Sequence, residues 1–255
     1  MEKKYFFFDI DGTLTRANTS LIPSDTLETL EQLRRHGHFV AAATGRLQAD
    51  AISICRAAGI ENMVSDGGNG LTIAGELAEL LPLPHQECIR LLEELEEKDI
   101  PWAISTENSH RRYSKTGRYA AAVPPNYAEN IILPDLDFHA QDAIYKVFAA
   151  CPPQREKEIA ALSALPRVRF NDFYFIIEPD DKAAGIRRMM DHFHAPYREV
   201  VVFGDGVNDL NMFSPQWFSI AMGNAEPALK ERANFITLPY DQGGITHACK
   251  KFGWI

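Results

Sequence analysis

Hydrophobic residues near the N-terminus occur first as a continuous run and then at helical spacing. The run at residues 5–10 is aromatic and β-branched, which is typical of a fully buried strand in a parallel sheet. Leucines at helical spacing then predict a helix that Ser24 caps and Gly37 ends. A second strand at residues 38–44 and a second helix at residues 45–58 follow. This alternation predicts an α/β sheet of parallel strands.

The pattern changes after a glycine-rich turn at residues 66–70, and Pro82 and Pro84 mark a boundary. Beyond it, neighbouring strand-like runs are separated by short polar links. This arrangement predicts an α+β insertion rather than a continuation of the first sheet. The expected helices are residues 85–98 and 154–165, and the expected strands are residues 102–106, 144–149 and 173–177, with another near Val168.

The strand–helix alternation resumes after the insertion, with a helix at residues 182–193, an apolar strand at residues 199–203 and a helix after Asp209. Two separated stretches of chain therefore encode the first sheet. We predict an α/β fold in which residues 1–81 and 181–255 form a Rossmann-like parallel-sheet core and residues 82–180 form an inserted α+β domain.

The composition is that of an ordinary globular protein, and the net charge limits the class of binding partner. Of the 255 residues, 45% are hydrophobic and 24% are charged, and the net charge is −9. This charge argues against nucleic acid as a partner, because nucleic-acid binders usually carry a basic stripe. It allows a small anionic substrate if a divalent cation and one or two basic groups neutralise that substrate locally.

The hydrophobic pattern predicts neither a membrane-spanning nor a secreted chain. No apolar run approaches the roughly 20 residues that cross a bilayer, and the run near the N-terminus is too short for a signal peptide. The four cysteines are widely spaced and form no CxxC pair. We therefore expect reduced thiols in a cytoplasmic protein.

Two carboxylates stand at the end of the first strand, in Asp9-Ile10-Asp11-Gly12-Thr13. Side chains two apart on a strand point the same way, so both can face one site at the carboxyl edge of a parallel sheet. One can attack phosphorus, and the other can protonate the leaving oxygen and then activate water. A hydrated turn explains the same residues. A calcium loop explains them less well, because a strand precedes the motif.

A second acidic turn, Gly204-Asp205-Gly206-Val207-Asn208-Asp209, follows the apolar strand at residues 199–203. Carboxylate oxygens are hard ligands that suit Mg²⁺, which usually takes one or two carboxylates together with water and substrate phosphate. A plain turn of glycine, asparagine and aspartate is again the alternative. Two acidic strand ends in one sheet make that alternative less favourable.

Two further positions have chemistry suited to phosphate. Thr44-Gly45-Arg46 ends the second strand, where a hydroxyl, a glycine and the free N–H groups of a helix start can cradle a phosphoryl group. An ordinary helix cap is the alternative. Lys182 begins the helix that returns the chain to the core, although a lone lysine is more often a solvated surface residue.

In this order, these pieces resemble the haloacid dehalogenase superfamily of phosphatases, and most closely its Cof-type subgroup, in which a large α/β cap follows the third core strand. The DxDGT and GDGVND motifs carry the resemblance. The stretch Ala221-Met222-Gly223-Asn224-Ala225 is similar to a further part of the subgroup. The resemblance covers nearly the whole chain and implies that residues 82–180 are the cap, which closes over the cleft and selects the leaving group.

The resemblance implies a magnesium site and a chemical role for the acidic residues. Asp9 would be the nucleophile and a Mg²⁺ ligand. Asp11 would be the acid/base and would also give its backbone carbonyl to the metal. Asp205 would bind Mg²⁺ directly. Asp209 would support the metal site without being a direct ligand of the ion.

The resemblance also implies a phosphate-binding set. Thr44, with Gly45 and Arg46, would bind the phosphoryl group. Lys182 would offset the charge of the nucleophile and of the phosphoryl oxygens, and Asn208 would support the phosphate. Positioning and charge neutralisation of this kind dominate phosphoryl transfer.

The implied activity is hydrolysis of small phosphorylated metabolites, with sugar phosphates as the common theme, by a monomer or a loose homodimer. Within the insertion, His110, Arg111 and Arg112 stand together in an expected loop or hairpin. They and Lys146 can meet a sugar or a second phosphate. For His110, Arg111 and Arg112, a solvated basic turn is the alternative.

Three rival functions share part of this chemistry. A P-type ATPase has a lysine at the position of Asp11 and needs transmembrane helices. A receiver signalling domain has a similar acidic pocket, but it is about half as long and lacks a cap. A phosphomutase of the same fold would keep the phosphate or pass it back, and the sequence leaves this alternative open.

Overall fold

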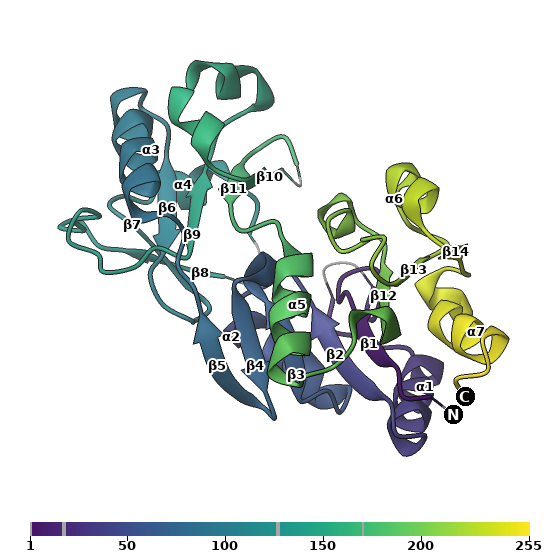
Figure 1. Cartoon of the computed structure of the whole chain (residues 1–255). Helices are drawn as coiled ribbons and strands as arrows, with labels where there is room; N and C mark the ends of the chain where they lie inside the picture. The colour runs from purple at the N-terminus through teal and green to yellow at the C-terminus, as the bar shows by residue number, and fades with distance from the viewer. Residues whose placement is uncertain (1, 17–18, 126–127, 170) are drawn as a thin grey trace. The chain divides into compact units, whose positions relative to one another are not determined.

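The computed structural model describes residues 2–16, 19–125, 128–169 and 171–255 (Figure 1). The chain divides into two compact units. Unit 1 comprises Met1–Leu80 and Asp181–Ile255, and unit 2 comprises Leu81–Asp180. The idea that unit 2 acts as a cap stays a prediction.

Unit 1 is built on an eight-stranded sheet in the order β14-β13-β12-β1-β2-β3-β4-β5. The strands from β14 to β3 run parallel to their neighbours, whereas β3, β4 and β5 form an antiparallel end. The predicted α/β fold with a parallel sheet is confirmed. The strands span Tyr5–Phe8 (β1), Phe39–Ala43 (β2), Asn62–Ser65 (β3), Gly70–Ile73 (β4), Glu76–Leu80 (β5), Val200–Gly204 (β12), Phe218–Ala221 (β13) and Phe235–Ile236 (β14).

Helices cover both faces of this sheet, which explains why its central strands are apolar at every position. Phe6 and Phe8 pack in one core cluster and Phe7 packs in another, and all three rings are fully buried. Each buried ring contributes about 1.5–3 kcal/mol. The first cluster includes residues of α1 (Ser24–Arg35), α2 (Gln48–Ala57) and α7 (Gly244–Lys251), and the second includes residues of α5 (Lys182–His192) and α6 (Pro227–Arg232).

The chain leaves unit 1 and re-enters it beside the same short turn. Leu80, at the end of β5, pairs with Gly70. Asp181, which begins the second stretch, donates its backbone N–H to the Gly67 carbonyl oxygen at 2.8 Å. A Cβ on Gly68 would lie 2.1 Å from the Asp181 carbonyl oxygen, so only glycine permits this approach. Both connections to unit 2 are thus anchored by the turn that ends β3.

Unit 2 contains a six-stranded sheet in the order β10-β11-β9-β6-β7-β8. Its pairs are antiparallel except for β7 and β8, which run parallel. Helix α3 packs into the larger apolar cluster of this unit. Its elements are α3 (His85–Glu97), β6 (Trp102–Ser105), β7 (Arg111–Ser114), α4 (Arg118–Ala122), β8 (Glu129–Ile132), β9 (Lys146–Ala149), β10 (Arg167–Val168) and β11 (Phe175–Ile177).

The helix predicted at residues 154–165 is wrong. Two 3-10 helices, Pro153–Glu158 and Ala160–Ala164, occupy this region. Ile159 between them is extended (φ −102°, ψ 101°) and buried. The Glu94 carboxylate accepts hydrogen bonds from the next two backbone amides, each at 2.8 Å. A tertiary contact therefore satisfies amides that a continuous helix would have paired internally.

Two predicted helix starts and one predicted helix in unit 1 are also wrong. Pro23 stands at the cap position of α1, so Ser24 lies inside the helix. Helix α2 begins at Gln48 and not at Gly45. The helix expected after Asp209 is a 3-10 turn, Val207–Asp209, followed by turns as far as β13. Helix ends are the least sharply defined part of a helix and shift by one or two residues, whereas the loss of the last helix is a larger difference.

The described helices include none with the length and apolar character needed to cross a bilayer. The four cysteines, Cys55, Cys88, Cys151 and Cys249, are free and buried. Burial raises the pKa of the Cys55 and Cys88 thiols to about 12, so both stay protonated and unreactive at neutral pH.

Gly185 allows α5 to lie close to β3, and replacing this residue tests the packing. A Cβ there would lie 2.3 Å from Val64 Cγ1 and 2.8 Å from the Gly68 carbonyl oxygen. Helix propensity alone favours alanine by about 1 kcal/mol, but overpacking costs about 1–3 kcal/mol. We expect Gly185→Ala to lower the free energy of unfolding in urea. The control, Ala184→Gly, should lower it by about 1 kcal/mol through propensity alone. A stabilised Gly185→Ala variant would contradict the close approach.

Candidate active site

Three strand ends place polar residues at one edge of the unit 1 sheet. Asp9 follows β1, Thr44 follows β2 and Asp205 follows β12. Strand β1 lies between the other two, with Phe8 opposite both Phe203 and Ala42. Because these strands are parallel, the three residues leave the sheet at the same edge, where α/β sheets bind ligands.

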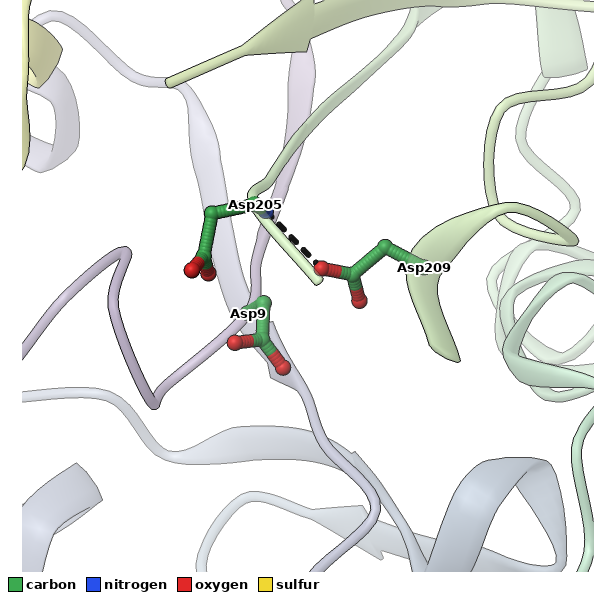
Figure 2. A group of neighbouring side chains, drawn as sticks. All are labelled: Asp9, Asp205 and Asp209. Carbon is green, nitrogen blue, oxygen red and sulfur yellow. Dashed lines mark hydrogen bonds between the residues drawn. The ribbon is translucent and has the colours of Figure 1, made fainter. Parts of the chain in front are cut away.

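Three carboxylates converge at this edge. Asp9, Asp205 and Asp209 each offer an oxygen within 4.8 Å of those of the other two. Figure 2 shows the three side chains grouped between the end of β1 and the turn after β12. Asp9 and Asp209 are buried, and Asp205 is partly exposed. The structure thus brings together two of the predicted metal ligands and the residue predicted to support them.

Lys182 joins this acidic cluster as its counter-charge. Its Nζ donates to Asp9 Oδ1 at 2.6 Å and to Asp209 Oδ1 at 2.5 Å. The side chain is 1% exposed, so it is not the solvated surface lysine that a lone lysine usually is. Asp181 caps α5 by accepting a hydrogen bond from the Ala184 amide at 2.9 Å. This cap fixes the start of α5 and with it the position of Lys182.

Asp209 also organises the turn in which it lies. Its Oδ2 accepts hydrogen bonds from the backbone amides of Asp205 at 2.9 Å and Gly206 at 3.0 Å, the first of which is drawn in Figure 2. Its other oxygen accepts from Lys182. Asn208 lies in the same 3-10 turn. Asp209 therefore links the backbone of this turn to Lys182.

Asp11 lies apart from the three carboxylates and pairs with Arg46. The guanidinium donates from Nε to Asp11 Oδ2 at 2.8 Å and from Nη2 to Asp11 Oδ1 at 2.7 Å. Sequence reasoning predicted Arg46 as a phosphate ligand and missed this ion pair. The hydroxyl oxygen of Thr44 accepts from the Arg46 amide at 3.1 Å, with Gly45 between them. The phosphate-binding roles of these three residues stay predictions.

The acidic cluster holds three carboxyl groups close together, with one lysine as their counter-charge. Burial raises the pKa of the Asp9 carboxyl well above its ordinary value, and the Asp209 carboxylate raises it further against the opposing effect of Lys182. Burial and then Asp209 raise the pKa of Asp205 to about 7. Burial lowers the pKa of Lys182, but Asp209 and Asp9 outweigh it and keep the ammonium charged. One ammonium does not balance three carboxylates.

A divalent cation fits this arrangement. Hard carboxylate oxygens within reach of one another are the donors that Mg²⁺ prefers, and the cation would remove the repulsion that raises the pKa values of Asp9 and Asp205. Gly12 brings the preceding turn against this group, with φ +86° and an ideal Cβ position only 2.2 Å from Asp205 Oδ2. Asp9, Asp205 and Asp209 are therefore the side chains that could hold the ion, and the Asp11 carbonyl stays a predicted ligand.

Sequence reasoning missed two residues that hold Asp205. The Thr13 hydroxyl donates to Asp205 Oδ1 at 3.0 Å. The Asn224 amide nitrogen lies 3.4 Å from Asp205 Oδ2. Thr13 is part of the first motif, and Asn224 follows the apolar strand β13. The stretch that contains Asn224 is part of the family resemblance, but sequence reasoning assigned no role to Asn224 from it.

The basic residues predicted for substrate contact in unit 2 have different environments. His110 and Arg111 are exposed in the hairpin between β6 and β7. Arg112 is buried, donates to Asn130 Oδ1 at 2.6 Å and stacks over the Tyr119 ring. Lys146 is buried against Glu178. Arg112 and Lys146 thus have structural partners, and contact of any of the four with substrate stays a prediction.

Comparison with known proteins finds similar sequences along the whole chain. The family model described as haloacid dehalogenase-like hydrolase matches residues 6–249. A Bacillus subtilis protein named "Putative phosphatase YkrA" is 32% identical over 262 aligned residues, which cover 99% of each chain. The "Phosphoglycolate phosphatase" of Nitrosopumilus maritimus is 26% identical and covers 98% of this chain and 96% of its own.

Two solved structures are similar over both units. A hypothetical protein of Geobacillus kaustophilus has a TM-score of 0.86 at 29% identity, with complete coverage of both chains. The subclass IIB sugar phosphatase BT4131 has a TM-score of 0.81 at 27% identity, and covers 99% of this chain and all of its own.

The raised pKa of Asp205 predicts how the stability of the metal-free protein depends on pH. This carboxyl has a pKa of about 7 in the folded chain and about 3.9 in an unfolded one. The contribution of this carboxyl to the free energy of unfolding is therefore complete below about pH 4 and is lost as the pH rises through about 7. In chelator at pH 8, we expect Asp205→Asn to be more stable than the wild type by up to about 4 kcal/mol. The difference in Tm should shrink towards pH 4; a difference independent of pH would contradict the shift.

Proposed function

The chain belongs to the haloacid dehalogenase-like hydrolase family and is a phosphatase of that family, and from this premise we propose that it hydrolyses small phosphorylated metabolites with Mg²⁺ through an aspartyl-phosphate on Asp9. The observation that carries the proposal is the cluster of buried Asp9 and Asp209 with partly exposed Asp205, in which Lys182 pairs with the two buried carboxylates. Such a group is costly to bury for structural reasons alone. It suits a site that receives a cation and a phosphoryl group.

Asp9 is the proposed nucleophile. Lys182 holds its Oδ1, which leaves Oδ2 to form the bond to phosphorus while the bond to the leaving oxygen breaks. Lys182 also keeps a positive charge beside the phosphoryl group that Asp9 would attack. Mg²⁺, when bound, would supply charge that offsets the phosphoryl oxygens and the carboxylates. Thr44, with Gly45 and Arg46, is proposed to bind the phosphoryl group and Asn208 to support it.

Asp11 is the proposed acid and base. Protonated Asp11 would give its proton to the leaving oxygen in the first step. The carboxylate that remains, the form that pairs with Arg46, would take a proton from the water that attacks phosphorus in the second step. That attack releases inorganic phosphate and restores the Asp9 carboxylate. Arg46 holds both Asp11 oxygens and so fixes the plane of this carboxyl. A carboxylate at this position favours hydrolysis of the intermediate.

Sugar phosphates are the proposed substrate class. The similarity to a sugar phosphatase supports it, although a phosphoglycolate phosphatase is also among the relatives. The relatives' names support hydrolysis rather than a phosphomutase reaction. We also propose a cytoplasmic location, which the four buried free thiols support.

Replacing the nucleophile should abolish turnover without unfolding the protein. Asp9→Asn removes the attacking oxygen but keeps the shape of the side chain and one acceptor for Lys182. We expect no phosphate release from p-nitrophenyl phosphate or a sugar-phosphate panel, with an unchanged circular-dichroism spectrum. In the wild type, chelation should stop release and added Mg²⁺ should restore it. Normal turnover by Asp9→Asn would refute the nucleophile, and metal-independent release would refute the role of the cation.

Replacing Asp11 should trap the intermediate. Asp11→Asn cannot activate water, and loss of a general base typically slows a step about 10²–10⁴-fold. We expect intact mass spectrometry to show one added phosphoryl group after mixing with p-nitrophenyl phosphate, whose leaving group needs little protonation. Asp9→Asn is the matched control and should stay unmodified. If a variant with both Asp9→Asn and Asp11→Asn still gained the phosphoryl group, the group would be attached to a residue other than Asp9.

A further inference from the structure

Asn224 is a single side chain that joins three distant segments of unit 1. Its Nδ2 donates to the Gly12 carbonyl oxygen at 2.8 Å and lies 3.4 Å from Asp205 Oδ2. Its Oδ1 accepts from the Tyr240 amide at 3.1 Å. A backbone N–H can only donate, so the oxygen must face Tyr240 and the nitrogen must face the site. The chemistry of an amide, with a donor and an acceptor, is therefore required here.

The Asp205 carboxylate is tethered at both oxygens. Thr13 donates to Oδ1 and Asn224 to Oδ2. An aspartate that follows a strand is otherwise free to rotate about its last torsion. Two donors on opposite oxygens fix the plane of the carboxylate and therefore the direction in which its lone pairs point. Both donors belong to segments other than that of Asp205.

The same amide steadies the turn after Asp9. The Gly12 amide donates to the Thr15 carbonyl oxygen at 2.8 Å, and the Gly12 carbonyl accepts from Asn224. The two peptide groups of Gly12 are thus held on both sides of its Cα. The first of them contains the Asp11 carbonyl, the predicted backbone ligand of the metal.

The segment that carries Asn224 is itself anchored. Lys230 Nζ donates to the Gly223 carbonyl oxygen at 2.7 Å. The Glu226 amide donates to the Asp205 carbonyl oxygen at 2.8 Å. A Cβ on Gly223 would lie 2.5 Å from the ring of Pro239. These contacts keep the amide in place before any ligand arrives.

We propose that Asn224 is a positioning residue that sets the affinity of the acidic cluster for its cation, by orienting Asp205 and the turn after Asp9. The proposal rests on the proposed Mg²⁺-dependent function. Groups that orient metal ligands in this way typically change metal affinity or activity about 10–100-fold when they are replaced. Asn224 acts through Asp205 and Gly12 and is not itself a catalytic residue.

The test is the Mg²⁺ dependence of Asn224→Ala and Asn224→Leu, the second of which keeps the branched shape and the number of heavy atoms of the side chain. We expect the Mg²⁺ concentration for half-maximal phosphate release to rise about 10-fold or more, while kcat at saturating Mg²⁺ stays near that of the wild type. The Mg²⁺ concentration needed to raise Tm should increase in parallel, which is a readout independent of activity. The control is Asn234→Ala, which removes an amide bonded to Ser219 elsewhere in unit 1 and should lower Tm without changing either Mg²⁺ dependence.

The outcomes separate the proposal from the function on which it rests. A wild type that shows no Mg²⁺ dependence in either assay refutes the proposed function. A Mg²⁺-dependent wild type with unchanged Mg²⁺ dependence in a folded Asn224 variant overturns the role of Asn224 alone. A variant whose kcat falls at saturating Mg²⁺ while its Mg²⁺ affinity is unchanged also overturns it. If Asn224→Ala does not fold, Asn224→Leu decides.

Discussion

Repulsion among three crowded carboxylates, two of them buried, is the constraint on which the rest of unit 1 depends. Asp9, Asp205 and Asp209 come from two strand ends, and Lys182 comes from a helix that faces them. Removing one partner of a buried ion pair typically costs about 3–5 kcal/mol, because the remaining charge has no compensation. A sheet that holds this group must therefore supply a hydrogen-bond donor to each carboxylate and a rigid frame for each donor.

The frame comes from ordinary packing. Fully apolar strands, with helices on both faces, fix the positions at which the chain turns out of the sheet. Glycine at position 12 lets the first turn touch Asp205, and the Asp181 cap fixes the helix that carries Lys182. The chemistry of the site is thus concentrated in a few residues, whereas the precision of the site is distributed through the core.

The parts of this arrangement that the sequence predicted are those with strong local signals. The runs before Asp9 and Asp205 are apolar at every position, so the strands and the chemistry at their ends could be placed. The pairing of Arg46 with Asp11 could not, because it depends on how two strand ends 35 residues apart face each other. The burial of Lys182 and the tether from Asn224 likewise depend on contacts between distant segments. In unit 2, the Glu94 carboxylate overrode a helix that local propensity favoured.

The shared anchor of the two connections has a consequence for how the chain can change in length. Leu80 pairs with Gly70, the first residue of β4, and Asp181 bonds to Gly67 in the turn before it, so both ends of the intervening segment contact one short stretch of chain. For a loop whose ends already meet, each doubling of length costs about 0.6 kcal/mol of closure entropy. By this rule, a domain of about 100 residues costs only about 2–3 kcal/mol more closure entropy than a short hairpin in that gap. Segments of very different size can be exchanged at this junction without disturbing the carboxylates beyond it.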